Sequence, residues 1–256
     1  MPFLDDLVAS TKKRVSEAKE LVNAEVFEQR ISAASPARGF EHALSGPGVS
    51  LVGEIVRRGP HCRLLNPHMN VTDQARAYAR GGACAVSVVT EPDFYEGSLE
   101  DLTKALAAEL PLLRRDLIVD QFQVMESRAW RADAVVFLAR AVGDGLRPLL
   151  SAARALRMDS LVEVHDERDL DTALEAGATL VGVNHLDLDT LAADPRRTEK
   201  LAPRVPPGVT LVSLMGTASR ADVQAAGDAG AAGVIVGETL VTARDPASKV
   251  RELIGF

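Results

Sequence analysis

The chain has 256 residues, a formal net charge of −7 and an isoelectric point near 5.3. This acidic balance argues against nucleic acid and anionic membranes as partners, because both attract basic surfaces. Mean hydropathy is +0.03, and no stretch approaches the ~20 consecutive apolar residues that a membrane span needs. The first residues lack the basic and apolar segments of a signal peptide, so we expect a cytoplasmic protein.

Metal and cofactor chemistry find little support in the sequence. The two cysteines, Cys62 and Cys84, lie in no CxxC pattern and share no ligand spacing with a histidine. There is no H-x-x-x-H pattern, and no Gly-rich dinucleotide-binding motif follows the first expected strand. We therefore expect no metal, no cofactor and free thiols.

The N-terminal segment, residues 1–48, predicts a helical extension. Apolar residues recur near helical spacing between residues 3 and 22, with charged residues between them. We expect amphipathic helices over residues 3–33 and a linker at residues 35–40. These helices would pack against the main body of the protein, which begins near Val49.

From there, short apolar runs typical of strands alternate with helical windows. The expected strands cover residues 50–56, 83–88, 112–115, 134–138, 160–164, 179–184, 209–214 and 233–236. The expected helices cover residues 71–80, 99–109, 121–131, 146–156, 167–176, 195–201, 220–229 and 246–253. Such alternation predicts a parallel sheet with helices packed on its faces.

Eight strand–helix units without a break in composition indicate an α/β protein with a single domain, residues 1–256. The closed (β/α)8 architecture, or TIM barrel, typically has about 250 residues and matches this pattern. An open, doubly wound sheet is the alternative. That fold usually carries a Gly-rich turn after its first strand, and this chain has none there.

Charged residues gather at the carboxyl end of the first expected strand. Glu54 is a lone acid within the apolar run, and Arg57, Arg58 and Gly59 follow it. The carboxyl ends of barrel strands carry the catalytic residues of this fold, which favours Glu54 as an active-site acid. The alternative is an ordinary strand in which Glu54 points into water.

A second acid, Glu163, lies near the end of the fifth expected strand, across the barrel mouth from Glu54. A carboxyl group in a partly dry cleft has a raised pKa and can transfer protons near neutral pH. The alternative is an ion pair with an arginine such as Arg115, which ends the third strand. His165 and His185 follow the fifth and sixth strands and could act as acid–base groups or cap the next helices.

Glycines follow the last two expected strands, at Gly216 and Gly237. Barrels commonly bind phosphate at this position, because glycine exposes backbone N–H groups to an anion. Each glycine alone could simply form a turn. As a pair after the seventh and eighth strands, they predict an anion site.

Longer motifs occur in order along the chain. They are residues 3–8 (FLDDLV), 53–55 (GEI), 85–91 (AVSVVTE), 94–102 (FYEGSLEDL), 112–120 (LLRRDLIVD), 161–166 (LVEVHD), 182–184 (GVN) and 236–240 (VGETL). Together they resemble the indole-3-glycerol phosphate synthase family. That family performs the decarboxylating ring closure of tryptophan biosynthesis.

The resemblance implies a carbon–carbon lyase, of carboxy-lyase and cyclase type, that uses no cofactor and acts on a small anionic substrate. The catalytic residues that we predict are Glu54, Glu163, Asn184 and Arg115. The substrate and phosphate contacts that we predict are Gly216, Gly237, Glu238, Arg57, Arg58 and His185. The protein would act as a monomer or a homodimer.

The sequence departs from the family pattern where that pattern carries chemistry. Val56 and Arg115 stand where the family has lysines, and Leu214 stands where it has a glutamate. Gly59 and Leu186 replace a serine and an arginine. Valine cannot transfer protons, and arginine, with a pKa above ~12, is a poor proton donor.

These departures leave three hypotheses about function. We favour an enzyme repurposed for a related anionic or phosphorylated substrate with an apolar or ring portion, acting by carboxylate acid–base chemistry. The second hypothesis is a genuine indole-3-glycerol phosphate synthase with altered catalytic groups. The third is a non-catalytic barrel that binds a ligand or a protein partner.

Overall fold

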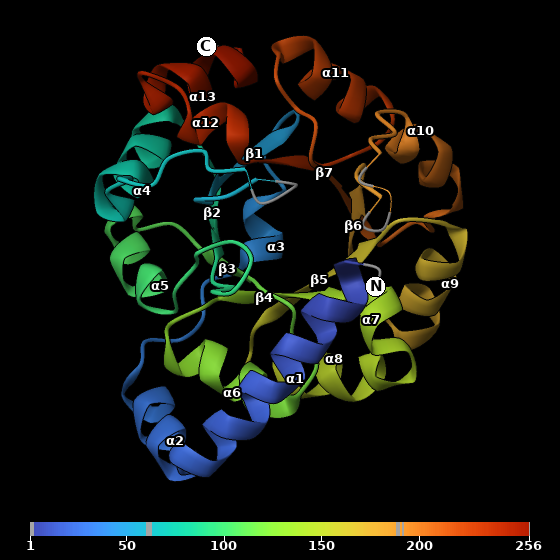
Figure 1. The fold of residues 1–256 in the computed structure, drawn as a ribbon. Helices are drawn as coiled ribbons and strands as arrows, with labels where there is room; N and C mark the ends of the chain where they lie inside the picture. The colour runs from blue at the N-terminus through green and yellow to red at the C-terminus, as the bar shows by residue number, and fades with distance from the viewer. Residues whose placement is uncertain (1–2, 60–62, 188–189, 191, 256) are drawn as a thin grey trace.

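A computed structural model describes residues 3–59, 63–187, 190 and 192–255 of the chain (Figure 1). Eight parallel strands close into one barrel in sequence order, and β8 pairs with β1. The strands are β1 (Ser50–Ile55), β2 (Ala85–Val89), β3 (Leu112–Arg115), β4 (Ala134–Leu138), β5 (Asp159–Val164), β6 (Leu180–Asn184), β7 (Thr210–Leu214) and β8 (Gly233–Val236). The predicted (β/α)8 barrel is confirmed, and the open doubly wound sheet is excluded.

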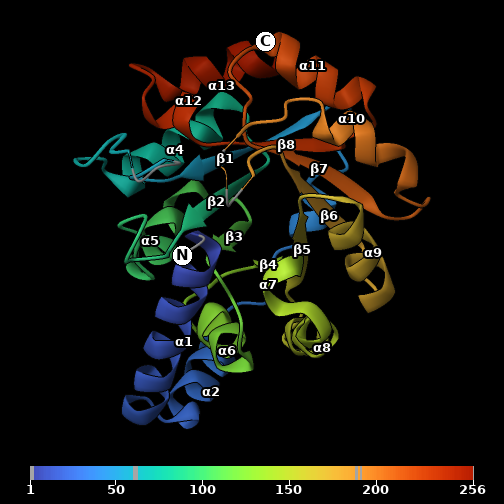
Figure 2. The same cartoon turned by 45° about the vertical axis from the view of Figure 1, so that its right-hand side comes forward.

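Helices follow the strands and surround the barrel (Figures 1 and 2). Those in predicted windows are α4 (Val71–Gly81), α5 (Glu100–Ala105), α6 (Gln121–Ala129), α8 (Leu146–Ala155), α9 (Glu167–Ala176), α10 (Arg197–Leu201), α11 (Arg220–Asp228) and α13 (Pro246–Ile254). Three helices of four residues were not predicted: α3 (Phe40–Ala43), α7 (Ala139–Val142) and α12 (Glu238–Val241). A single turn is too short to show helical periodicity. Among the described residues, no helix is long and apolar enough to cross a membrane.

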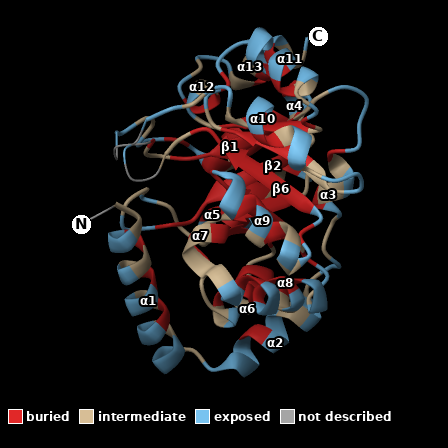
Figure 3. Cartoon of the chain, turned by 90° about the vertical axis from the view of Figure 1, so that its right-hand side faces the viewer, coloured by how far each residue is buried: buried red, intermediate tan, exposed pale blue. Residues whose placement is uncertain are grey.

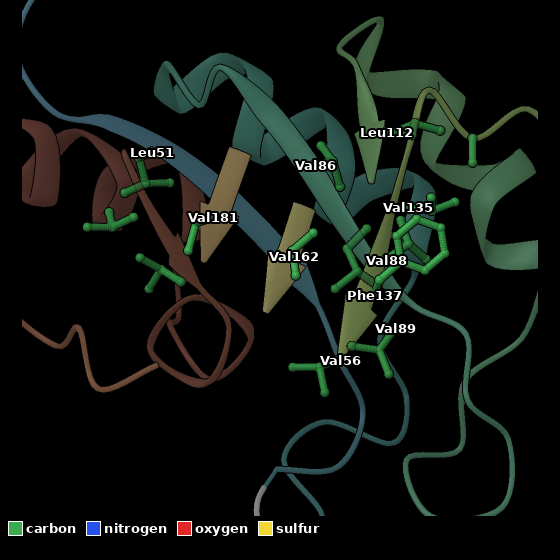
Figure 4. Close-up of a cluster of buried hydrophobic side chains, with 14 of the residues drawn as sticks. Leu51, Val56, Val86, Val88, Val89, Leu112, Val135, Phe137, Val162 and Val181 are labelled. Atoms are coloured by element: carbon green, nitrogen blue, oxygen red, sulfur yellow. The ribbon is translucent and has the colours of Figure 1, made fainter. Parts of the chain in front are cut away.

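The side chains of β1 alternate between the barrel interior and the surrounding helices, as a strand requires. Leu51 and Ile55 belong to the apolar layer under the helices, and Val52 belongs to the cluster inside the barrel. Figure 4 shows part of the layer that contains Leu51. Glu54 shares the parity of Val52, so it points inward at the carboxyl end of the barrel.

The same alternation directs other polar residues into the barrel. Arg115 stands two positions after Leu113 on β3, and Glu163 stands two positions after Leu161 on β5. Both leucines lie in the interior cluster. Asn184 ends β6 with the inward parity of its strand. Three polar side chains from separate strands therefore point, like Glu54, into the carboxyl end of the barrel above an apolar interior.

Helix α3 closes the opposite end of the barrel. Phe40 and Leu44 are fully buried in the interior cluster, and the Ser50 hydroxyl at the start of β1 donates to the Leu44 carbonyl at 3.2 Å. Figure 1 places α3 within the ring of strands. The amino ends of the strands are thus sealed, which leaves the carboxyl ends as the place for a site.

The two N-terminal helices, α1 (Phe3–Leu21) and α2 (Ala24–Ala33), lie beside α6 (Figures 1 and 2). Figure 3 shows the exposed residues of α1 in pale blue. The rings of Phe27 and Phe122 pack with their centroids 5.1 Å apart. Arg14 on α1 reaches the loop after β2, with Nη1 3.2 Å from Glu91 Oε1 and 2.7 Å from Asp93 Oδ2. The helical extension therefore reaches the carboxyl ends of the strands, where Leu7 lines the cavity described next.

Candidate active site

A cavity of about 450 Å³ opens at the carboxyl ends of the strands. Most of the predicted site residues line it: Glu54, Arg58, Arg115, Glu163, Asn184, Gly216, Gly237 and Glu238. Arg57 and His185 lie outside its lining. Apolar side chains from strands, loops and α1 contribute to the wall, among them Leu7, Val56, Leu65, Leu117, Leu138, Leu186 and Met215.

Arg115 lies between the two acids at the floor of this cavity. Its Nε is 3.4 Å from Glu54 Oε2, and its Nη2 is 3.0 Å from Glu163 Oε2. Both carboxylates are almost fully buried, at 5% and 6% exposure. The Ser87 hydroxyl donates a further hydrogen bond to Glu54 Oε2 at 3.0 Å. The predicted alternative of an ion pair with Arg115 is therefore correct for both acids.

This arrangement sets the ionisation of Glu163. Burial alone would raise its pKa, but the charges of Arg115 and His165 and a hydrogen bond from Asn184 outweigh burial and lower the pKa. Asn184 Nδ2 donates to Glu163 Oε1 at 2.7 Å. The expected raised pKa was thus wrong for Glu163, because the sequence did not reveal that a cation and a donor contact the same carboxylate. In the free site Glu163 is ionised and can act as a base.

Arg115 is a permanent cation in this site. Burial opposes its charge, but Glu163 and Glu54 keep its pKa raised. Its Nη1 contacts no other described residue through a hydrogen bond or ion pair. Because guanidinium groups carry five N–H donors, Arg115 keeps donors for an anion in the cavity.

Backbone contacts hold the strand ends that carry these residues. The Tyr78 hydroxyl on α4 donates to the Glu54 carbonyl at 2.9 Å, and Gln74 Nε2 donates to the Tyr78 oxygen at 3.0 Å. Arg197 Nη1 on α10 donates to the Asn184 carbonyl at 2.6 Å. Helices on the outside of the barrel thus fix the orientation of the polar groups inside it.

The two arginines after β1 have different partners. Arg57 makes a bidentate ion pair with the fully buried Asp101, at 2.5 and 3.1 Å, and so ties the loop after β1 to α5. Arg58 lines the cavity and pairs with Glu96 at 2.5 Å. Of the two, only Arg58 lines the cavity, and use of Arg57 by a ligand would break its pair with the buried Asp101.

His185 faces away from the main cavity. Its Nε2 lies 2.7 Å from the Thr198 hydroxyl and 3.2 Å from the Ser213 hydroxyl. These three residues line a second cavity of about 260 Å³. Burial and the neighbouring charge of Arg197 lower the pKa of His185, against the opposing effect of Asp194. His185 is therefore neutral at pH 7 and lies in a separate polar cluster.

Gly216 and Gly237 both lie at the cavity rim, but their surroundings differ. Gly216 has φ +80°, directly after Met215 at φ +70°, so the chain turns sharply there. A Cβ at Gly237 would lie 2.9 Å from Glu54 Oε1 and 3.2 Å from Val56 Cγ1. The absence of a side chain at residue 237 thus makes room for the Glu54 carboxylate.

Glu238 follows Gly237 and brings negative charge to the rim. Its carboxylate forms an ion pair with Arg63, so an anion beside it would meet a partly neutralised acid. Among the described lining residues, the arginines are Arg58 and Arg115. An anion bound in the cavity would therefore meet these two cations and backbone N–H groups of the lining.

Replacing Gly237 with alanine should displace the Glu54 carboxylate and destabilise the protein by about 1–3 kcal/mol, the usual cost of overfilling a packed site. Chemical denaturation measures this change. Gly145→Ala is the matched control, because no atom lies within 4 Å of a Cβ there and its φ is −70°. Equal stability of the two variants would contradict the proposed contact.

The positions that depart from the family pattern do not all reach the cavity. Val56, Gly59, Arg115 and Leu186 line it. Leu214 does not, since it is fully buried in the barrel interior, where its Cδ1 would lie 2.9 Å from a Cβ at Gly182. Leu214 therefore fills space below the site.

Several residues of the site were missed from the sequence. Ser87 is an inward-facing hydroxyl in an otherwise apolar strand, a signal that strand parity could have revealed. Leu7 and Tyr95 line the cavity from outside the strands, and only the three-dimensional arrangement places them there. Within the described part of the chain, no three His, Cys, Asp or Glu side chains are grouped to hold a metal ion.

Comparison with known proteins places this site in a family context. A family model described as indole-3-glycerol phosphate synthase matches residues 4–253. The chain is 40% identical over 255 residues to indole-3-glycerol phosphate synthase 2 of Streptomyces coelicolor, covering 99% of each chain. It is 37% identical over 258 residues to indole-3-glycerol phosphate synthase of Syntrophobacter fumaroxidans, covering 99% of this chain and 97% of the relative.

More distant solved structures share the architecture alone. Orotidine 5'-phosphate decarboxylase from Pyrococcus horikoshii OT3 aligns with a TM-score of 0.59 at 14% identity, covering 80% of this chain and 100% of the other. Thiamine phosphate pyrophosphorylase from Pyrococcus furiosus aligns with the same TM-score, at 14% identity over 80% of this chain and 94% of the other. The match to the family model and to the two synthases spans nearly the whole chain. The chain therefore belongs to the indole-3-glycerol phosphate synthase family.

Proposed function

We propose that the protein catalyses the decarboxylating ring closure for which its relatives are named, and that it is an indole-3-glycerol phosphate synthase with altered catalytic groups. The observation that carries this proposal is the position of Arg115 between Glu54 and Glu163, with Asn184 bonded to Glu163. This group lies at the carboxyl ends of the strands, where barrel enzymes perform their chemistry.

The substrate implied by the family, a carboxyphenylamino-deoxyribulose phosphate, carries a carboxylate, a ketone and a phosphate. Arg115 would bind the substrate carboxylate through its remaining N–H donors. An anion that also pairs with Arg115 weakens the interaction of this cation with the two glutamates. The pKa of a glutamate then rises toward neutral pH. A carboxyl group then becomes available as the acid that activates the ketone.

The phosphate would lie at the rim near Gly216 and Gly237. Gly216 exposes its backbone at a turn with φ +80°, and Arg58 lines the same cavity. Arg63, which pairs with Glu238, would provide further positive charge by turning from its carboxylate partner to the phosphate. These contacts would orient the substrate, while the acid–base steps take place near Glu163.

Incubation of the purified protein with carboxyphenylamino-deoxyribulose phosphate tests this proposal. We expect the fluorescence of an indole product to appear, at a rate proportional to enzyme concentration. Complete absence of indole fluorescence at high enzyme concentration would reject the proposed reaction.

A second candidate is a related reaction on a different anionic substrate. The observation in its favour is the apolar wall to which Val56 and Leu186 contribute, where the family pattern has a lysine and an arginine. Such a wall suits a ligand with a larger ring or apolar portion. The variant Val56→Lys separates the two candidates. A higher rate of indole formation in this variant favours the parent reaction. Loss of binding of the native substrate in this variant favours the second candidate.

A further inference from the structure

His165 lies directly after β5 and is buried behind Glu163, with its side chain 1% exposed. Its Nε2 is 3.5 Å from Glu163 Oε1, and its Nδ1 is 3.5 Å from Asp169 Oδ2. Neither ring nitrogen has a hydrogen-bond partner within bonding distance. His165 does not line the main cavity, so it contacts the site only through Glu163.

The loop between β5 and α9 fixes this imidazole. The His165 backbone N–H donates to Asp169 Oδ2 at 2.9 Å, and Arg140 Nε on α7 donates to the same oxygen at 2.8 Å. Asp166 caps α9 by accepting the Asp169 N–H at 2.9 Å. The ring is thus held between two carboxylates, one at the active site and one on the outer layer.

Both neighbours of the ring are hydrogen-bond acceptors when ionised. A neutral imidazole has one N–H donor and can satisfy only one of them, whereas an imidazolium has two donors and satisfies both. An unpaired polar group is costly at a buried position. The charged groups that face the ring directly or through one partner are Glu163 on β5, Asp169 and Asp166 on α9, Arg140 on α7 and Arg115 on β3.

We propose that His165 is the proton partner of Glu163. In the free site both carboxylates are ionised, and the imidazolium form of His165 satisfies both of them. When bound substrate shares Arg115, the proton passes from His165 Nε2 to Glu163 Oε1, and Glu163 donates it to the substrate ketone. When Glu163 later accepts a proton from the substrate, the reverse transfer restores the imidazolium, which Asp169 stabilises. One proton moves between two atoms, no other bond changes, and His165 acts as a positioning residue that never contacts the substrate.

The kinetic test rests on the proposed ring closure. His165→Gln should lower kcat on the order of 10²-fold, at the lower end of the range for lost acid–base groups, with KM within about threefold. It should also shift the acidic limb of the pH–rate profile, a change that a purely structural role would not produce. His42→Gln, an exposed residue on α3, is the control. A kcat within twofold of wild type and an unchanged profile would overturn the proposal.

A second measurement does not depend on any reaction. Nitrogen-15 NMR of histidine-labelled, ligand-free protein reports the proton on each ring nitrogen, and His165→Gln identifies the His165 signals. We expect Glu163→Gln to change the His165 signals and to leave those of the exposed His42 and His68 unchanged. Unchanged His165 signals in a folded Glu163→Gln protein would refute the proton pair. If these signals change but no ring closure occurs, the proposed reaction fails and the proton pair stands.

Discussion

Replacing Arg115 with methionine should destabilise the protein by about 3–5 kcal/mol, because two buried carboxylates then lack their shared cation. Glu54 and Glu163 lie 3.4 and 3.0 Å from the guanidinium. In the described part of the site Glu54 has no other ion-pair partner, and the further partner of Glu163 is the His165 ring at 3.5 Å. Chemical denaturation at pH 7 measures the free energy of unfolding. For a chain of this size, each kcal/mol lowers Tm by about 2–4 °C.

Two further variants make this experiment specific. Arg168→Met removes an exposed arginine from α9, and it should change stability by no more than about 0.5 kcal/mol. Arg115→Lys keeps the positive charge but lacks the planar guanidinium group that reaches both acids. Its loss of stability should therefore be smaller than that of Arg115→Met and larger than that of Arg168→Met. An Arg115→Met protein as stable as wild type would show that the acids do not depend on this cation.

The stability difference between wild type and Arg115→Met should also depend on pH. The pKa of Glu163 lies below its usual value of 4.5 in the folded protein, so its ionised form stabilises the fold at higher pH. That contribution is present above about pH 4.5 and disappears as pH falls through the lowered pKa. The difference should therefore shrink in acid. A constant difference from pH 7 to pH 3 would contradict the lowered pKa.

Replacing Glu163 with glutamine should lower the rate of ring closure by about 10²–10⁴-fold, the range for loss of a proton-transfer group. Glutamine keeps an oxygen that can accept from Asn184, so the protein should remain folded. Steady-state kinetics from indole fluorescence measure kcat, and thermal unfolding checks the fold. Glu100→Gln, an exposed acid on α5, is the control. A Glu163→Gln enzyme with wild-type kcat would exclude Glu163 as the proton-transfer group.

The inward-facing polar residues could be predicted because strand geometry is simple. Successive side chains alternate across a strand, so an acid two positions after an interior leucine must also point inward. Glu54 and Glu163 were predicted at the barrel mouth because they lie near the carboxyl ends of the first and fifth expected strands, and the alternation explains why they point inward. Asn184 was predicted from the family resemblance, and its Nδ2 lies 2.7 Å from Glu163 Oε1.

Contacts between residues far apart in the chain could not be predicted from strand geometry. The sequence gives no sign that Arg57 pairs with Asp101, which lies 44 residues further along the chain. It also gives no sign that His185 turns toward Thr198 and Ser213. Each of these positions follows a strand, but the direction of the side chain depends on a partner from another element.

The lowered pKa of Glu163 has the same origin. Burial could be inferred from the position of this acid in a strand, and burial alone predicts a raised pKa. The pKa of Glu163 is lowered instead, because Arg115, His165 and Asn184 converge on this carboxylate from two further strands and the end of β5. A prediction from local sequence includes the burial and omits these three contacts.

The central claim is that this site closes an indole ring although Val56 and Arg115 stand in place of the family lysines. Release of labelled carbon dioxide from carboxyl-labelled carboxyphenylamino-deoxyribulose phosphate, with enzyme in excess over substrate, tests it most directly. We predict that wild-type protein releases one carbon dioxide for each indole product, and that Glu163→Gln releases it far more slowly. Bound substrate that yields neither carbon dioxide nor indole in the wild-type protein would contradict the claim.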